Sequence, residues 1–361
     1  CQVQHWKEGG HDQLCKKINR SGGAEQYHAN NKYSEAVAVA VEKCADDTKG
    51  QTCFICTEGI KRRTGEGLVS EFCACRGGSS FAHVSCLAEQ AKILWADAEE
   101  NNLDIGARFQ RWHTCNLCKQ RYHSVVACAL GWACWKTYVG RPEADQARRF
   151  AINLLGNGLA AANHNEDALT VQEAMLSMLR RLGDSEENLL VVKGNLASTY
   201  QALGRLEQAL RLKLDLYSGS LRLHGEQHKG TVIAAYNYAD CLVRLNRFEE
   251  AKSLLRKMIP VARRVFDESS EITLKMRWKY AEALCRDTAA TLDDVREAVK
   301  TLEDTERTAR RVLGGANPFV GMVEGTLRVS RELLSACESA CDTGSESISE
   351  AFAAMTPSPR G

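Results

Sequence analysis

Eight residues whose side chains bind metal ions fall between positions 53 and 118. In chain order they are Cys53, Cys56, Cys73, Cys75, His83, Cys86, Cys115 and Cys118. A C-x2-C pair places two thiolates on one tight turn, close enough to bind a single tetrahedral Zn²⁺ at about 2.3 Å per Zn–S bond. Eight ligands complete two coordination spheres and leave no position open for a substrate. The sequence therefore predicts two structural zinc ions.

A disulfide framework is the alternative explanation for so many cysteines. It would require an oxidising compartment and a secretory signal, and the sequence gives no sign of either. We therefore expect zinc binding and a reducing interior, cytoplasmic or nuclear.

The spacing of the ligands separates two families that share their order. A PHD finger usually has two residues between its third and fourth ligands, whereas here Ala74 alone separates Cys73 from Cys75. Seven residues then precede His83, where a PHD finger has four or five. This pattern resembles the RING-CH (variant RING) domain. The resemblance extends to the local sequences CFIC at 53–56, CRGGS at 75–79, HVSCL at 83–87 and CNLCK at 115–119.

The resemblance implies a cross-braced domain over residues 51–123. One ion would be held by Cys53, Cys56, His83 and Cys86, and the other by Cys73, Cys75, Cys115 and Cys118. The 28 residues between Cys86 and Cys115 exceed the usual family range. We therefore expect an insertion in the central helix and the loop that follows it.

Domains of this type have no nucleophile of their own, and by resemblance they bind a ubiquitin-conjugating enzyme charged with ubiquitin. The docking surface would contain Ile55, Leu87, Trp95 and Leu117, and Lys119 would contact ubiquitin. Two alternatives stay open. Ile55, Leu87 and Trp95 could instead pack the small core of the domain, and Lys119 could be an ordinary solvated charge.

Residues 1–19 resemble the C-terminal half of a MYND finger, whose ligands would be Cys1, His11 and Cys15. The upstream cysteines of that family are absent, so we expect the natural N-terminus to be missing from this sequence. Three ligands do not close a zinc site, so a further ion is expected only if the finger is complete. A leader with two chance cysteines is the alternative.

Two helical segments flank the predicted finger. Residues 20–50 carry apolar side chains at helical spacing and predict a helical linker. Residues 124–142 predict a connecting helix around the most apolar stretch of the chain, 125–139. That stretch is too short to span about 30 Å of hydrocarbon, so no membrane span is expected.

The second half of the chain repeats with a period of 42 residues. Asn153, Asn195, Asn237 and Lys279 occupy equivalent positions. Each unit reads as two antiparallel helices, and a stack of such hairpins forms an α-solenoid. The pattern resembles tetratricopeptide repeats of the kinesin light chain type. Four units and a capping helix are predicted over 143–334, followed by a disordered tail over 335–361 that is rich in Ser, Ala and Gly.

Three of the repeated residues are candidate groove contacts. By resemblance, Asn153, Asn195 and Asn237 would face a concave groove and hydrogen-bond the backbone of a bound peptide. Alternatively, they cap or pack the turns between repeats.

The expected fold is mostly α, with a small two-zinc RING-CH domain followed by the solenoid. The chain has 361 residues with 47 Lys and Arg against 46 Asp and Glu, which argues against nucleic acid as the main partner. Two functions remain. One is a ubiquitin ligase that recruits a conjugating enzyme through the finger and a protein or peptide substrate through the groove. The other is a non-enzymatic adaptor.

Overall fold

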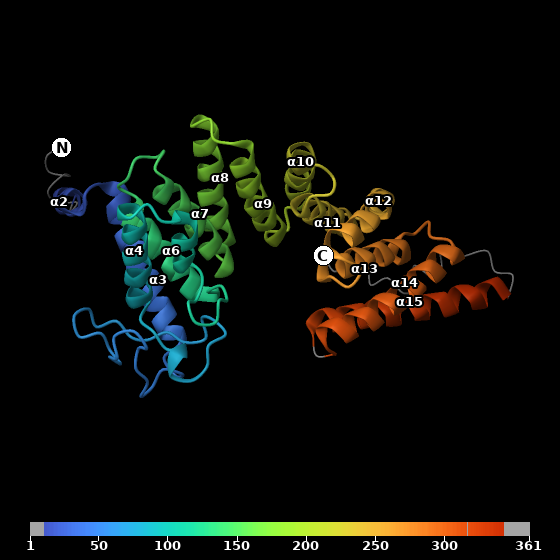
Figure 1. Cartoon of the computed structure of the whole chain (residues 1–361), viewed down its shortest axis with the longest axis horizontal. Helices are drawn as coiled ribbons and strands as arrows, with labels where there is room; N and C mark the ends of the chain where they lie inside the picture. The colour runs from blue at the N-terminus through green and yellow to red at the C-terminus, as the bar shows by residue number, and fades with distance from the viewer. Residues whose placement is uncertain (1–10, 316, 343–361) are drawn as a thin grey trace. The chain divides into compact units, whose positions relative to one another are not determined.

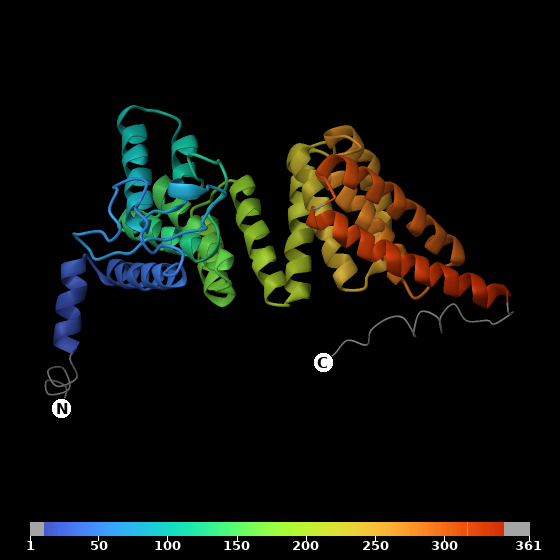
Figure 2. The ribbon, with the colours of Figure 1, turned by 90° about the horizontal axis from the view of Figure 1, so that it is seen from below.

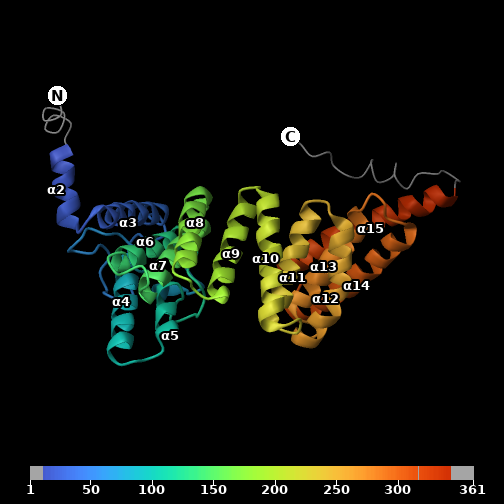
Figure 3. The same ribbon diagram turned by 90° about the horizontal axis from the view of Figure 1, so that it is seen from above.

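The computed structural model describes residues 11–315 and 317–342 of the chain. These residues are mostly helical, and among them no β-strand forms beyond two isolated bridges, Val69 to Ala82 and Thr114 to Arg121. The chain divides into two compact units, Cys1–Ser185 and Glu186–Gly361. Figure 1 labels most helices of both units, and Figure 3 also labels α5 (Ile105–Phe109).

The first unit begins with α2 (His11–Ser21) and α3 (Ala24–Lys43). Helix α3 lies beside α6 (Ser124–Tyr138), as Figure 3 shows. The Lys136 ammonium sits 3.7 Å from the centre of the Tyr33 ring, and the Gln26 amide donates to the Lys136 carbonyl at 2.8 Å. The segment predicted as a linker is therefore a packed part of this unit.

The predicted finger consists of long loops around one main helix. Its elements are the 3₁₀ turn η1 (Gly77–Ser80), α4 (Val84–Glu100), α5 (Ile105–Phe109) and the 3₁₀ turn η2 (Gln110–Trp112). The elements α5 and η2 lie where the sequence predicted an insertion. Asp104 caps α5 by accepting from the Ala107 N–H at 3.1 Å. The Phe109 ring packs edge-on against Trp95 of α4, with ring centres 5.6 Å apart.

Helix α6 is apolar around most of its circumference and is buried by its neighbours. One face packs with the finger, and the opposite face packs with α7 (Gln146–Ala161). Glycine allows α6 and α7 to approach closely. A Cβ atom on Gly158 would lie 2.6 Å from the Ala127 carbonyl oxygen, and one on Gly131 would lie 3.1 Å from the Leu155 Cα.

The first predicted repeat, α7 with α8 (Asn165–Arg181), belongs to the same compact unit as the finger. The sequence instead predicted a single solenoid beginning at residue 143. The difference arises because α7 covers α6. Arg148 on α7 also donates to the carbonyls of Val139 and Arg141, at 2.6 and 2.8 Å.

The second unit consists of three further helix pairs and one final helix. They are α9 (Glu186–Ala202), α10 (Leu206–His224), α11 (Lys229–Arg244), α12 (Phe248–Phe266), α13 (Glu271–Arg286), α14 (Leu292–Leu313) and α15 (Pro318–Asp342). Each helix packs on the next. The turns inside the first two pairs use Gly204 and Asn246 at positive φ, and Ala209 and Ala251 are fully buried at the start of the second helices. Helical hairpins were predicted, and they form.

Helix α15 closes this unit. Phe319, Val320 and Val323 are buried in the same cluster as the side chains of α13 and α14, and Figure 2 shows α15 lying along α14. Leu333 and Cys337 continue this contact. The prediction of a disordered tail from residue 335 is therefore wrong for 335–342, which are helical. Residues 343–361 lie outside the described part of the chain.

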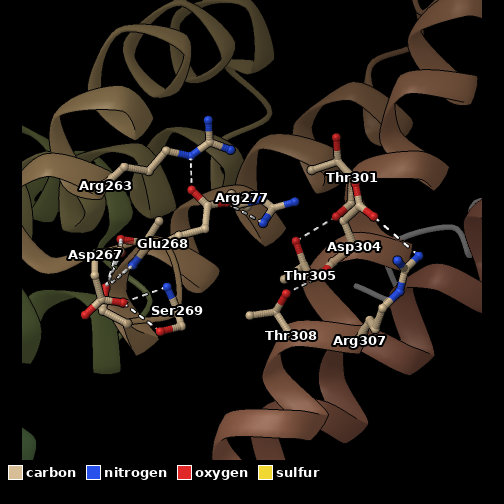
Figure 4. A network of polar contacts seen from close by, with 12 residues as sticks. Arg263, Asp267, Glu268, Ser269, Arg277, Thr301, Asp304, Thr305, Arg307 and Thr308 are labelled. Carbon is tan, nitrogen blue, oxygen red and sulfur yellow. Dashed lines mark hydrogen bonds and ion pairs between the residues drawn. The ribbon is translucent and has the colours of Figure 1, made fainter.

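Polar contacts fix the turn between α12 and α13, as Figure 4 shows. Glu268 pairs with Arg263 at 2.5 Å and with Arg277 at 3.0 Å. Asp267 ends α12 at φ 92°, and the equivalent position at the end of α10 is Gly225. The Asp267 carboxylate accepts a hydrogen bond from the Ser269 N–H at 2.7 Å. Side-chain hydrogen bonding thus compensates for a backbone conformation that favours glycine.

We expect Gly158→Ala to destabilise the first unit by about 1–3 kcal/mol, because the new methyl group meets backbone rather than a movable side chain. Urea unfolding followed by tryptophan fluorescence measures this. In the control Gly321→Ala, on an open face of α15, the new methyl meets nothing within 4 Å. That variant should gain up to about 1 kcal/mol. Equal effects of the two substitutions would contradict the close contact of α6 and α7.

Candidate metal centres and binding grooves

The structure gathers the eight predicted ligands into two groups of four. Within each group the ligand atoms all lie within 4.8 Å of one another. The groups are Cys53, Cys56, His83 and Cys86, and Cys73, Cys75, Cys115 and Cys118. Pairs from the two groups alternate along the chain, which is the cross-braced partition that the resemblance implies. Both donor sets, S₃N and S₄, are those of closed structural zinc sites.

The first group is assembled around His83, which is fully buried at the N-terminus of α4. Its Nδ1 atom lies 3.3 Å from the Cys56 Sγ and 3.7 Å from the Cys86 Sγ, so Nδ1 is the candidate ligand atom. Lys61 approaches from outside the group. Its ammonium donates to the Ser85 hydroxyl at 2.8 Å and to the Cys86 Sγ at 3.4 Å. A cation beside a thiolate favours the charged form that binds metal.

The two C-x2-C turns have the same backbone hydrogen bonds. In the first, the Thr57 N–H donates to the Cys53 carbonyl at 2.8 Å. In the second, the Lys119 N–H donates to the Cys115 carbonyl at 3.0 Å. Thr57 and Lys119 both have positive φ, 64° and 60°. The repeated geometry directs both thiols of each turn toward one point.

The Cys53 and Cys86 thiols in the first group share a hydrogen bond. A hydrogen bond from Cys86 is the main cause that lowers the pKa of the Cys53 thiol to about 4. The same interaction raises the pKa of Cys86. A metal ion would replace this sharing, because all three cysteines of the group must bind as thiolates.

The predicted docking residues separate into exposed and buried ones. Leu117 is 54% exposed between two ligands of the second group, and Lys119 is exposed. Ile55 is half-buried. Leu87 and Trp95 are each only 2% exposed, so the prediction that they form a docking surface is wrong. The finger core surrounds Leu87, while the insertion and α6 cover Trp95, so both residues are core.

The partial MYND assignment gains no metal group in the structure. Cys1 lies outside the described residues. His11 begins α2, and Cys15 is half-exposed in the same helix. Cys15 joins no candidate metal group among the residues that the structure describes. The fourteen cysteines from Cys15 to Cys337 are free of disulfides.

The predicted groove asparagines are divided between the two compact units, with Asn153 in the first and Asn195 and Asn237 in the second. Asn237 lines a groove of about 550 Å³ in the second unit, and Asn153 lines a cavity in the first unit. Asn195 is among the lining residues of neither. The three asparagines are therefore equivalent in the repeat without forming one row in one compact unit.

A buried lysine in the second-unit groove was not predicted from the sequence. Lys213 is 6% exposed and donates to the Gln201 side chain, and burial lowers the pKa of its ammonium. Across the groove, Asp240 pairs with Arg244 at 2.9 Å and with Lys279 at 3.0 Å. The only sequence signal was a lysine at a position of α10 that faces inward. The residues that line the groove therefore include two basic side chains, Lys213 and Arg244, and one acidic side chain, Asp240.

Comparison with known proteins supports the repeats. The family model for the tetratricopeptide repeat matches residues 185–264, which contain the two hairpins from α9 to α12. No curated protein matches the chain. The chain therefore contains tetratricopeptide repeats, and these imply protein partners.

Two solved structures resemble the chain at low similarity. BtubC (BKLC) from P. vanneervenii has 14% identity and a TM-score of 0.45, covering 77% of this chain and 94% of its own. The putative kinesin light chain TPR-like repeats from Podosopora anserina have 16% identity and a TM-score of 0.44, covering 64% and 98%. The repeat assignment rests on the family match and the helix pairs. Among the described residues, no helix has both the length and the apolar character that a membrane crossing needs.

Removal of metal should affect the two units differently. Finger, α6 and α7 share buried clusters, so a strong chelator should remove hydrogen-exchange protection from α4, α6 and α7 together. Protection of α9–α15 should stay unchanged. Elemental analysis before treatment should give two zinc ions per chain. One zinc or none, or loss of protection in α9–α15, would contradict the assignment.

Lys61→Met should weaken zinc binding by the first group about 10- to 100-fold, because it removes the N–H···S contact to Cys86 and keeps every ligand. Competition with a chromophoric chelator measures the affinity. The matched control is Lys49→Met, since Lys49 is exposed and pairs only with Asp46, at 2.9 Å. Unchanged affinity in both variants would show that Lys61 does not support the site.

Proposed function

We propose that this chain is a two-zinc interaction scaffold that works as a RING-type ubiquitin ligase. The finger would dock a ubiquitin-conjugating enzyme charged with ubiquitin, and the repeats would bind the substrate. The observation that supports this most directly is the exposure of Leu117, at 54%, between two ligands of a closed metal group. An apolar side chain held on a rigid metal-bound turn is a suitable anchor for a partner.

The chemistry proposed for the finger is positioning. Its ligand cysteines would be saturated by zinc and unavailable as nucleophiles. Catalysis would come from holding the thioester of the conjugating enzyme in a reactive geometry, which lowers the entropic cost of the transfer. Lys119 is exposed directly after the last ligand, where its charge could contact ubiquitin.

In this proposal the groove of the second unit would hold a peptide segment of the substrate. Asn237 could hydrogen-bond the peptide backbone. Lys213 and Arg244 give the groove a positive bias, which favours an acidic segment over a basic one.

A non-enzymatic adaptor is the second candidate. One specific observation favours it, namely the burial of Leu87 and Trp95. Because Leu87 and Trp95 are buried, Ile55 and Leu117 are the remaining predicted apolar residues of the docking surface. An adaptor would use the same groove and the same zinc-stabilised finger without transferring ubiquitin.

Autoubiquitination against a panel of ubiquitin-conjugating enzymes separates the two functions. Leu117→Ala should reduce chain formation about tenfold, the effect of losing about 1–2 kcal/mol at a small interface. Zinc content should not change. Ile60→Ala is the control, because Ile60 is 68% exposed in the finger but outside both ligand turns.

If the unaltered protein builds no chains with any conjugating enzyme while its groove still binds peptides, the adaptor is the correct function. Equal loss of activity in Leu117→Ala and Ile60→Ala would contradict a specific role for Leu117.

A further inference from the structure

The first unit contains a cavity of about 430 Å³ between the finger and α7. One wall comes from the insertion that precedes Cys115, through Phe109 and Trp112, and from the residues that follow Cys118, through Arg121 and Tyr122. The other wall is α7, through Phe150 and Asn157. The volume is within the range of small-ligand pockets. Neither the metal groups nor the repeat groove of the second unit includes this cavity.

Aromatic side chains form much of the cavity wall. The Phe109 and Phe150 rings lie 4.9 Å apart between centres, one from the insertion and one from α7. Trp112 is 1% exposed and Tyr122 is 7% exposed, so both are held firmly in the surrounding core. A bulky apolar group entering the cavity would therefore meet walls that are already in place.

The polar groups of the cavity carry one sign of charge. Arg121 is exposed, and within the described part of the chain its guanidinium has no hydrogen-bond or ion-pair partner. None of the lining residues is acidic. The cavity thus presents one uncompensated positive charge.

Amide groups from α7 complete the polar set. Asn153 and Asn157 are four residues apart and line the same cavity, so both lie on one face of the helix. The Asn157 amide has no hydrogen-bond partner among the residues that the structure describes. A side-chain amide offers both a donor and an acceptor, which matches a peptide group.

We propose that this cavity binds the C-terminal residue of a partner polypeptide, a bulky apolar residue with a free α-carboxylate. The carboxylate would pair with Arg121, whose fork geometry suits two carboxylate oxygens. The side chain would pack against the Phe109 and Phe150 rings, and the last peptide group would meet the Asn157 amide. A chain end supplies the apolar group and the carboxylate on a single residue, which suits a cavity of this volume. The inference does not rest on ligase activity.

The test uses the full zinc-loaded chain and three pools of N-acetylated pentapeptides that end in a bulky apolar residue. The first pool ends in a free carboxylate, and the second ends in a carboxamide. The third ends in a carboxamide and carries glutamate before the final residue. Affinity selection followed by fluorescence polarisation of the retained peptides gives the dissociation constants.

We expect peptides of the first pool to bind at least tenfold more tightly than their carboxamides. Arg121→Ala should remove that difference, because the substitution deletes the charge that pairs with the carboxylate. Asn157→Leu should weaken binding several-fold. Arg63→Ala is the matched control, since Arg63 is exposed in the finger and does not line the cavity, and it should bind like the unaltered protein.

Zinc content is measured in each variant, so that loss of the finger is not mistaken for loss of the site. Three results would overturn the proposal. They are no retention from any pool, equal binding of acids and carboxamides, and preference for the third pool, which would indicate an internal acidic residue instead of a chain end. Equal losses in Arg121→Ala and Arg63→Ala would likewise remove Arg121 from the site.

Discussion

Helix α6 imposes the central constraint on the first unit. It carries apolar side chains on nearly every face, so its stability depends on being covered from all sides. Val125 and Leu130 pack toward the finger, and Trp132 and Cys134 pack toward α7 and its neighbours. Burial of each large apolar side chain contributes on the order of 1.5–3 kcal/mol. The finger, α3 and the first hairpin thus all pack on α6, and removing any of them would expose apolar side chains of this helix.

The candidate metal groups of this unit lie in the same buried cluster as α6, because Cys53, Cys73 and Cys86 pack there with Val125 and Leu130. The finger loops between Gln51 and Val84 contain little regular structure, and they carry five of the eight candidate metal ligands. The second unit uses no metal group among its described residues. Its order comes from repeated small contacts, such as buried Ala209 and Ala251 at helix crossings and positive φ at the turns. The same chain thus combines two different sources of stability.

The sequence was sufficient wherever local spacing determined the outcome. The partition of the eight ligands follows from their order by resemblance, and the hairpins follow from the 42-residue period. It was insufficient where two segments distant in sequence compete for one surface. Helical periodicity identifies Leu87 and Trp95 as one apolar face of α4, but it does not show that the finger core and the insertion cover that face.

The 42-residue period likewise gives no sign that the first predicted repeat packs within the same compact unit as the finger. Asn153 repeats with Asn195, yet α7 packs on α6, and no periodicity reveals that contact. Likewise, the composition of 335–342 suggested disorder, while Cys337 is fully buried against the core. The burial of Lys213 could not be predicted either, because the sequence does not show which side chains a lysine on the inward face of a helix contacts.

The shared core between the finger and the first hairpin has an evolutionary consequence. Exchange of modules between genes preserves folding only when the cut falls where few contacts cross. A recombination point at residue 142, which the repeat period would suggest, separates α6 from α7 and exposes both, including the close backbone approach at Gly158. A point at Ser185 leaves each compact unit intact. A segment that keeps the candidate zinc ligands with their buried surroundings must therefore include the hairpin of α7 and α8.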